Sequence, residues 1–292
     1  MPGYRTGSFD APKDLDKTTT PDNTAVFIPM DPPGAFNPMP DNNLLVWYDA
    51  TSLSGTNGSS VTAWVDKSGN GNDLGPSGSG GGNPTLTVPG QNGLPVVAFS
   101  GTQCLQSAKS WLVKLGFTNP YSIISLTRLA GSINTDTLLT TALSNNNGGI
   151  FQYQDLFTIS NAVNIVILRQ SGVGLSTDVY QYNDGTSINI VGEWALWSWA
   201  YSGQQLVQLD NTRAIPWLYK NQILRNMHRI TAQFTGVPSV LAANPTFVGG
   251  RGNGSQPGGF VGSLAELLVY NSVIPDAQRA AVETYLRHKW NF

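Results

Sequence analysis

Residues 260–290 read FVGSLAELLVYNSVIPDAQRAAVETYLRHKW, and two patterns within this stretch decide the fold class. Phe260–Tyr270 is mostly apolar, which predicts a buried β-strand. Beyond Pro275 apolar side chains return every fourth residue, which predicts an amphipathic helix over Asp276–Trp290. The apolar face of this helix consists of Val282, Leu286 and Trp290, with Ala281 and Tyr285 beside them. We therefore expect a strand followed by a helix that packs against the sheet.

The residues before this stretch indicate many more strands. Charged residues make up only 12% of the chain, whereas glycine occurs 32 times. Long amphipathic helices need charged outer faces, so this composition excludes a helical bundle. Short apolar or alternating runs recur between turn residues at the spacing expected of a sandwich or barrel. Besides Phe260–Tyr270, we predict strands at Leu44–Tyr48, Thr62–Asp66, Val96–Phe99, Tyr121–Leu129, Thr137–Leu143, Gly149–Gln154, Ala162–Arg169, Val179–Tyr182, Ser187–Val191, Ala195–Tyr201, Trp217–Lys220 and Thr246–Gly249.

Residues 1–42 differ in composition from the rest of the chain. Eight of the 18 prolines lie among the first 40 residues. Because proline fixes φ and donates no backbone hydrogen bond, we expect an extended or polyproline-like arm. Its isolated apolar side chains Phe9, Phe27, Ile28 and Phe36 are predicted to anchor the arm in grooves of a partner chain. Residues 43–292 are predicted to form one sandwich domain.

Three groups of residues resemble concanavalin A-like, laminin-G-type domains. The opening group is Trp47-Tyr48-Asp49-Ala50, residues 61–74 (VTAWVDKSGNGNDL) and Gly93-Leu94-Pro95-Val96-Val97. The closing group is residues 260–271 with the helix, and Trp217-Leu218-Tyr219-Lys220-Asn221-Gln222 is similar to a strand and turn between the two. The resemblance implies an all-β jelly-roll sandwich of two antiparallel sheets. It also implies binding of carbohydrate or protein, sometimes with calcium, by a module of an extracellular or virion protein.

The sequence departs from that family pattern at three places. Gln222 stands where a turn glycine is usual, and Pro275 stands where a helix-capping serine is common. Residues Gln204–Pro216 do not align with the pattern. These departures concern local turns and leave the expected fold unchanged.

One turn has part of the spacing of a calcium loop. Asp66, Asn70, Asn72 and Asp73 supply oxygen atoms around Gly71 at the sixth place. The second half of such a loop is missing, because leucine and serine stand at its ninth and twelfth places. The residues favour a tight turn whose side chains accept backbone hydrogen bonds. A Ca²⁺ site is the alternative, and no other cofactor is expected.

Several classes of function are excluded or disfavoured. No cluster of Lys or Arg is present to bind a phosphate backbone, so we expect no nucleic acid partner. No apolar run approaches the length that crosses a bilayer, so we expect no membrane partner. The two histidines, His228 and His288, and the three glutamates, Glu193, Glu266 and Glu283, form no recognisable catalytic pattern. The chain is therefore predicted to be non-enzymatic.

The resemblance to extracellular modules, the arm and an N-terminus without an apolar signal segment together predict a bacteriophage virion protein. Such a protein is made in the host cytoplasm and exposed on the particle surface. We expect a capsid decoration protein, bound through its arm to capsid or other virion proteins and forming homo-oligomers on the particle. One alternative is a tail-fibre or receptor-binding module that recognises host carbohydrate through the loop residues Asn145, Asn146, Asn147, Arg251 and Asn253. Another is a cell-surface protein exported by a route that needs no classical signal.

Overall fold

The computed structural model describes residues 42–78, 81–111, 115, 119–130, 138–140, 152–153, 158–160, 163–171, 177–182, 192–201, 217–225, 227–233, 245–250 and 259–292. The chain divides into two units, Met1–Ala35 and Phe36–Phe292, and all of the described residues belong to the second. The single described α-helix, α1 (Asp276–Trp290), is too short to cross a bilayer.

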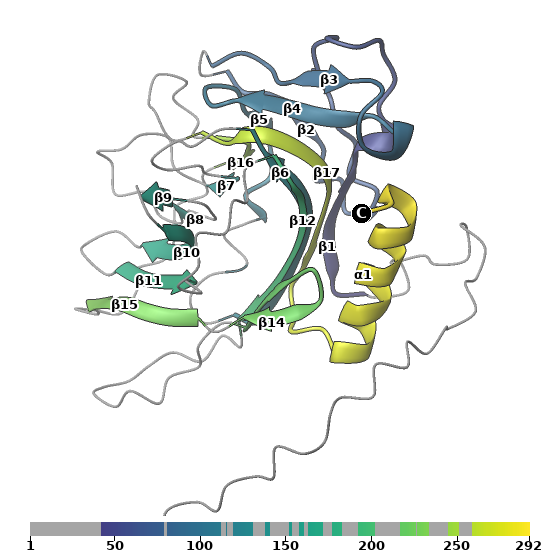
Figure 1. Ribbon diagram of the computed structural model, residues 1–292. Coiled ribbons are helices and arrows are strands. Elements are labelled where there is room, and N and C mark those ends of the chain that lie inside the picture. Colours follow the sequence, from purple (N-terminus) through teal and green to yellow (C-terminus); the bar gives the residue numbers. More distant parts are fainter. Residues whose placement is uncertain are drawn as a thin grey trace, which may run out of the picture. The chain divides into compact units, whose positions relative to one another are not determined.

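An eight-stranded antiparallel sheet forms the centre of the described fold (Figure 1). Strand β17 (Val261–Tyr270) lies beside β6 (Tyr121–Leu129) along one edge, while β4 (Val96–Ser100) and β1 (Leu44–Asp49) share its other edge. Strand β4 pairs with the first half of β17 and β1 with the second half. The strands in their spatial order are β14 (Ile223–Arg225), β13 (Trp217–Lys220), β12 (Trp194–Tyr201), β6 (Tyr121–Leu129), β17 (Val261–Tyr270), β4 (Val96–Ser100) and β3 (Thr85–Thr87), with β1 (Leu44–Asp49) on β17.

Two smaller antiparallel sheets lie across the concave side of the large sheet (Figure 1). The first consists of β15 (Met227–Gln233), β11 (Thr177–Tyr182), β10 (Val163–Ser171) and β9 (Thr158–Ser160). The second consists of β2 (Leu74–Pro76), β5 (Leu105–Ser107), β16 (Thr246–Val248), β7 (Leu139–Thr140) and β8 (Gln152–Tyr153). The predicted all-β antiparallel sandwich with one C-terminal helix is confirmed. Its second layer consists of the two smaller sheets.

The register of the large sheet assigns its side chains to two faces. Trp199 lies opposite Ile123, which in turn lies opposite Val269, and all three are buried. The neighbouring residues Ser198, Ile124 and Leu268 form the next row and point to the other face, because side chains alternate along a strand. Trp197 and Trp199 are only 1% and 2% exposed, so the tryptophans of β12 belong to the core, as their alternation predicts.

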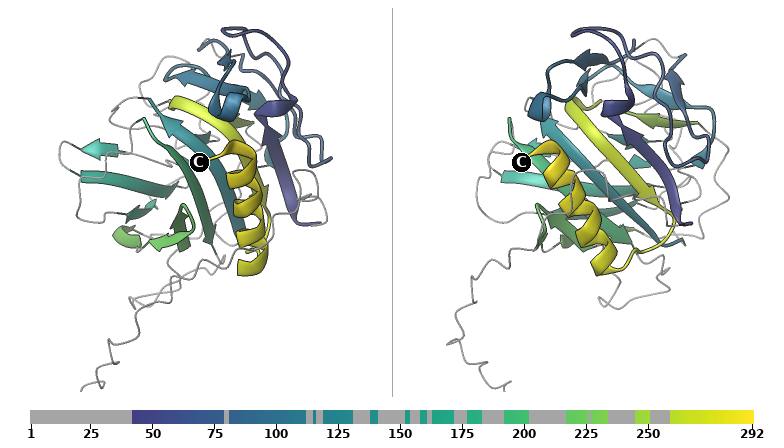
Figure 2. Two further views of the ribbon diagram at one scale, coloured as in Figure 1. Left: turned by 45° about the vertical axis from the view of Figure 1, so that its right-hand side comes forward. Right: turned by 90° about the vertical axis from the view of Figure 1, so that its right-hand side faces the viewer.

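Helix α1 covers the convex face of this sheet, on the side away from the smaller sheets (Figures 1 and 2). Its bounds are those predicted from the apolar spacing, and Val282, Leu286 and Trp290 are fully buried. Pro275 precedes the helix and offers no side-chain cap, but its carbonyl accepts the backbone N–H of Arg279. The helix therefore begins without the capping serine that is common in the family pattern.

One predicted strand is absent from the described residues, and another, Ser187–Val191, lies outside them. Thr62–Asp66 is not a strand, since only Trp64 in this segment pairs, through a single bridge to Leu74. Val61, just before the segment, donates its backbone N–H to the carbonyl of Pro84, whereas Asp66 donates its N–H to the side chain of Asp73, so no continuous strand pairing forms here. Six strands were not predicted, and they are β2, β3, β5, β9, β14 and β15, which are short except for β15.

Candidate functional site

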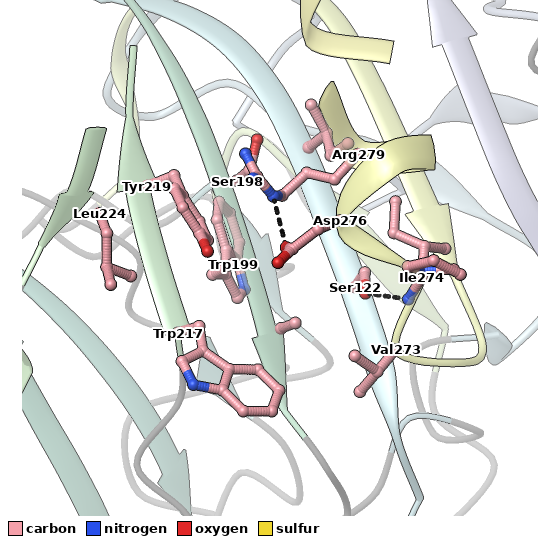
Figure 3. Close-up of a pocket in the computed structure, with 13 residues that line it drawn as sticks. Ser122, Ser198, Trp199, Trp217, Tyr219, Leu224, Val273, Ile274, Asp276 and Arg279 are labelled. Atoms are coloured by element: carbon pink, nitrogen blue, oxygen red, sulfur yellow. Dashed lines mark hydrogen bonds and ion pairs between the residues drawn. The ribbon is translucent and has the colours of Figure 1, made fainter. Parts of the chain in front are cut away.

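A pocket of about 460 Å³ lies on the convex face of the large sheet, next to the first turn of α1 (Figure 3). Strands β6 and β12 contribute Ser122, Ile124, Ser198 and Ala200, which form its inner wall. Strand β13 contributes Trp217 and Tyr219, and β14 contributes Leu224. The segment between β17 and α1 closes the opposite side with Val273, Ile274 and Pro275, followed by Asp276 and Arg279 of the helix.

An aromatic surface forms one side of the pocket. Trp217 and Tyr219 are two residues apart on β13, so both side chains point to the face that α1 partly covers. Trp217 is 49% exposed, which is unusual for the largest apolar side chain. Leu224 lies opposite Tyr219 on β14 and is 54% exposed. The pocket wall formed by β13 and β14 therefore presents apolar surface to solvent.

Arg279 fixes the position of the Tyr219 ring. Its guanidinium carbon lies 3.6 Å from the ring centroid, which is a cation–π contact. Nη1 of Arg279 donates to both carboxylate oxygens of Glu283, at 2.8 and 2.9 Å, and Nε donates to Asp276 at 3.3 Å. The Glu283 side chain is buried, so its charge is balanced by Arg279 inside the fold. Arg279 is thus held in one orientation before any ligand arrives.

Asp276 and Ser198 are two further polar residues that line the pocket, and their side chains differ in exposure. The carboxylate of Asp276 is 82% exposed and points toward the open space in front of Tyr219 (Figure 3). The hydroxyl of Ser198 is buried at the inner wall and has no hydrogen-bond partner among the described residues. By contrast, the hydroxyl of Ser122 donates to the carbonyl of Ser272 and accepts the N–H of Ile274, so it anchors the segment before α1. Asp276, which is exposed apart from its contact with Arg279, is therefore a polar group with which a ligand can pair.

A second polar cluster lies beneath the last turn of α1 and is fully occupied by its own residues. Nζ of Lys289 lies 2.7 Å from Asp49 Oδ1 and 2.8 Å from Glu266 Oε2. Lys67 binds the other oxygen of Asp49 at 2.6 Å. Glu266 also accepts the indole N–H groups of Trp47 and Trp290, at 2.7 and 2.9 Å. Because every carboxylate oxygen is paired, this cluster attaches the helix to β1 and β17.

Burial and charge shift the pKa values of this cluster in opposite directions. Burial raises the pKa of Asp49, but the charge and hydrogen bond of Lys289, with that of Lys67, outweigh it, so the pKa lies below its ordinary value. Burial and the charge of Asp49 raise the pKa of Glu266, and the contacts of Lys289 and Trp290 only partly oppose them. Burial lowers the pKa of Lys289, but Glu266 and Asp49 raise it above its ordinary value. The lysine is therefore held charged between the two carboxyl groups.

The residues predicted for a calcium loop meet in one hydrogen-bonded turn. Asp66 accepts the backbone N–H groups of Trp47, Ser68 and Asn72, at 2.9, 2.9 and 3.0 Å. Asp73 accepts the N–H of Asp66 at 2.8 Å.

In the same turn, the amide groups of Asn70 and Asn72 donate to the carbonyl of Leu45, at 3.1 and 2.8 Å, and Asn70 also donates to that of Leu44 at 2.8 Å. This arrangement is a hydrogen-bonded turn of the kind that the sequence favours. It ties the turn to β1.

The remaining predicted site residues lie outside the described residues. These are the arm residues Phe9, Phe27, Ile28 and Phe36 and the loop residues Asn145, Asn146, Asn147, Arg251 and Asn253. The pocket residues were not predicted as a site. Trp217 and Tyr219 were placed correctly on a strand, but nothing in the sequence distinguishes their exposed face from the core face of Trp197 and Trp199.

Comparison with known proteins identifies no family and no curated relative for this chain. Similar solved structures include domain 4 of AbnA, an extracellular GH43 arabinanase from Geobacillus stearothermophilus in complex with arabinotriose. That similarity has a TM-score of 0.43 and 16% identity and covers 81% of this chain and 96% of that domain. At this identity and score it does not define a function for the chain.

Two further similarities extend over only part of the other protein. The binding domain of Paraclostridial Mosquitocidal Protein 1 has a TM-score of 0.48 and 12% identity, over 84% of this chain and 52% of that one. Trypanosoma rangeli sialidase in complex with sialic acid has a TM-score of 0.47 and 12% identity, over 89% and 35%. The chain therefore spans about half or less of these two proteins, and its function has to be argued from its own residues.

Proposed function

We propose that this chain is a non-catalytic, lectin-like module that binds carbohydrate in the pocket beside the first turn of α1. The observation that carries the proposal is the half-exposed Trp217 next to Tyr219 on the pocket wall. A sugar ring has an apolar C–H face and an edge of hydroxyl groups, so it pairs with an aromatic surface that has polar groups beside it. The volume of about 460 Å³ lies within the range of small-molecule sites.

Asp276 is placed to orient a sugar bound on the aromatic surface. As an exposed carboxylate it accepts hydrogen bonds from hydroxyl groups. The contact of Arg279 keeps the Tyr219 ring in place, which reduces the conformational entropy lost on binding. The aromatic surface is therefore held in place by contacts of the protein itself.

The same residues support binding without catalysis. Glycoside hydrolysis uses two carboxyl groups on opposite sides of the scissile bond. Asp276 is the one carboxylate among the residues that line the pocket, and Glu283 is committed to Arg279 behind it. We accordingly propose a binding module rather than a hydrolase.

A matched pair of variants tests the site. Trp217→Ala removes the exposed ring, whereas Val65→Ala trims a side chain of similar exposure, 58%, that does not line the pocket. A glycan array on the full chain selects a saccharide, and isothermal titration then measures its affinity for all three proteins. We expect Trp217→Ala to weaken binding at least tenfold and Val65→Ala to leave it unchanged. No binding across the array, or equal affinities for the two variants, would overturn the proposal.

The place of the module in a virion is a further part of the proposal. Of the two virion roles that the sequence predicts, the pocket supports a tail-fibre or receptor-binding module better than a capsid decoration protein. A decoration protein needs surfaces that match its neighbours on the capsid, but it has no need of a ligand pocket with an exposed tryptophan. In either role the arm of residues 1–42 would provide the attachment.

A further inference from the structure

We infer that the pocket accepts uncharged saccharides and discriminates against those that carry a carboxylate, such as sialic and uronic acids. The inference rests on the proposed carbohydrate function and concerns the charge of the same site. It follows from how Arg279, Glu283 and Asp276 share their charges.

Arg279 is the only cation among the residues that line the pocket, and its Nε and Nη1 groups already have partners within the fold. Recognition of a carboxylate by arginine relies on parallel N–H bonds from the guanidinium edge. Here Nη1 already donates to both oxygens of Glu283, and Nε faces Asp276. The flat face of the guanidinium lies on Tyr219. Arg279 therefore acts as a positioning residue for the aromatic surface.

The charges around the pocket do not cancel. Arg279 contributes one positive charge, while Glu283 and Asp276 contribute two negative charges, which leaves a net charge of −1 in this group. Because Glu283 is buried against Arg279, the excess negative charge resides at the exposed Asp276. A ligand carboxylate near Asp276 would face a like charge, whereas a hydroxyl group could donate to it.

The start of helix α1 opposes this effect but does not reverse it. The N-terminus of a helix carries the equivalent of about half a positive charge. Asp276 is the first residue of α1 and carries a full negative charge, so the end of the helix remains negative. The exposed charge that a ligand meets at this end of the pocket is therefore negative, which suits a hydroxyl donor and not a carboxylate.

Pairs of sugars that differ by a single group test this inference. Methyl glucoside and methyl glucuronide share one ring, as do methyl galactoside and methyl galacturonide, and each pair differs by a hydroxymethyl group replaced by a carboxylate. These four ligands and N-acetylneuraminic acid are titrated into the full-length protein at low ionic strength. We expect the neutral member of the pair that binds to have at least a tenfold higher affinity than its acidic counterpart.

The variants Asp276→Asn and Glu193→Gln assign the discrimination to a residue. Both remove one negative charge, but Glu193 is exposed just before the start of β12, about 15 Å along the strand from Ser198. We expect Asp276→Asn to reduce the preference for the neutral sugar at least threefold and Glu193→Gln to leave it unchanged. Equal effects of the two variants would overturn the role of Asp276.

The outcomes separate this inference from the proposed function. Acidic sugars that bind as tightly as neutral ones, with affinity lost in Trp217→Ala, would overturn the charge selection and leave the carbohydrate function standing. Failure of all five ligands, together with an empty glycan array, would overturn the carbohydrate function itself. If the neutral sugar binds more tightly than its acidic counterpart, and Trp217→Ala loses this binding, both the carbohydrate function and the charge selection would be supported.

Discussion

Lys289 is the residue on which the attachment of α1 depends. It joins Asp49 of β1 and Glu266 of β17, and the carboxyl groups of both are almost fully buried. A buried ion pair contributes little compared with apolar side chains of the same size, but removing one partner leaves an unpaired charge in the core. The local sequence around Lys289 shows only a basic last turn, which also suits the helix dipole. The structural role of Lys289 depends on Asp49 and Glu266, which lie outside that local sequence.

Replacing Lys289 with methionine is expected to destabilise the fold strongly. Lys289→Met keeps the aliphatic stem but removes the charge between Asp49 and Glu266, so the free energy of unfolding should fall by about 3 kcal/mol. Arg287→Met, in the same helical turn, removes an exposed charge of the last turn and its hydrogen bond to Gln222, and should change it by less than about 1 kcal/mol. Urea denaturation measures both variants. Similar losses would contradict the role of the buried cluster.

Tyr285 predicts how stability changes at alkaline pH. Burial and the charge of Glu266 raise its pKa from 10.0 to about 12. Between these values the folded protein holds the phenol proton while the unfolded chain releases it, so stability falls as pH rises. The raised pKa of Lys289 acts in the same direction. Denaturation midpoints from pH 9 to 12 should therefore fall less steeply in Tyr285→Phe than in the wild type, and parallel curves would contradict the assignment.

The hairpin formed by β13 and β14 shows how a departure from the family pattern is accommodated. Lys220 pairs with Ile223, which leaves Asn221 and Gln222 as a two-residue turn with φ values of +52° and +69°. Two positive φ values are typical of the turn for which Asn-Gly is preferred. Gln222 adopts this conformation although it has a side chain, and its Oε1 accepts a hydrogen bond from Arg287. The two-residue turn is therefore formed without a glycine at its second position.

Substitution of Gln222 by glycine is expected to stabilise the protein. A side chain in the left-handed region costs about 1–2 kcal/mol, and the exposed hydrogen bond to Arg287 offsets part of this. Gln222→Gly should therefore raise the free energy of unfolding by about 0.5–1 kcal/mol. Gln222→Ala keeps the positive φ and loses the hydrogen bond, so it should be no more stable than the wild type. Thermal unfolding of the three proteins decides between these outcomes.

The elements that could be predicted from the sequence are those in which apolar residues recur at a regular spacing between clear turn residues. Strands β6 and β13 and helix α1 have their predicted bounds, because apolar spacing and flanking turn residues mark both ends. Strands β2, β3 and β5 have three residues each, which is too short for a periodic signal. Their pairing is decided by neighbours that are distant in the sequence.

The pocket could be predicted only in part, for a related reason. Trp217 and Tyr219 alternate on β13 as expected, but their exposure depends on where α1 begins on the same face. Arg279 belongs to the pocket because it lies on Tyr219, about sixty residues earlier in the chain. No local pattern contains that contact. The hydrogen-bonded turn around Asp66, by contrast, was predictable, since its partners lie within one short segment and β1.

At the scale of the whole molecule, the sandwich and the arm are predicted to have separate tasks. The described sandwich contains the pocket and its own buried core. The arm of residues 1–42 is proline-rich and carries isolated apolar side chains, so binding to a partner has to offset the entropy lost when it becomes ordered. If the tasks are separate, particle attachment and saccharide binding can be abolished independently of each other.

A full-length variant with Phe9, Phe27, Ile28 and Phe36 all changed to alanine tests this separation. Wild type and variant are mixed with phage particles that lack the protein, and with separated capsids and tails, and bound protein is measured by sedimentation. We expect the wild type to bind and the variant to lose at least tenfold in affinity, because a few apolar side chains dominate such interfaces. Trp217→Ala should bind particles like the wild type.

The particle fraction that retains the protein distinguishes the two virion roles. Retention on tails would favour the receptor-binding module, and retention on capsids would favour the decoration protein. Binding of the alanine variant at wild-type affinity would contradict anchoring by these side chains. If the wild type binds neither tails nor capsids, the virion assignment is wrong, whereas saccharide binding at Trp217 would remain, because the pocket is formed by residues of the sandwich alone.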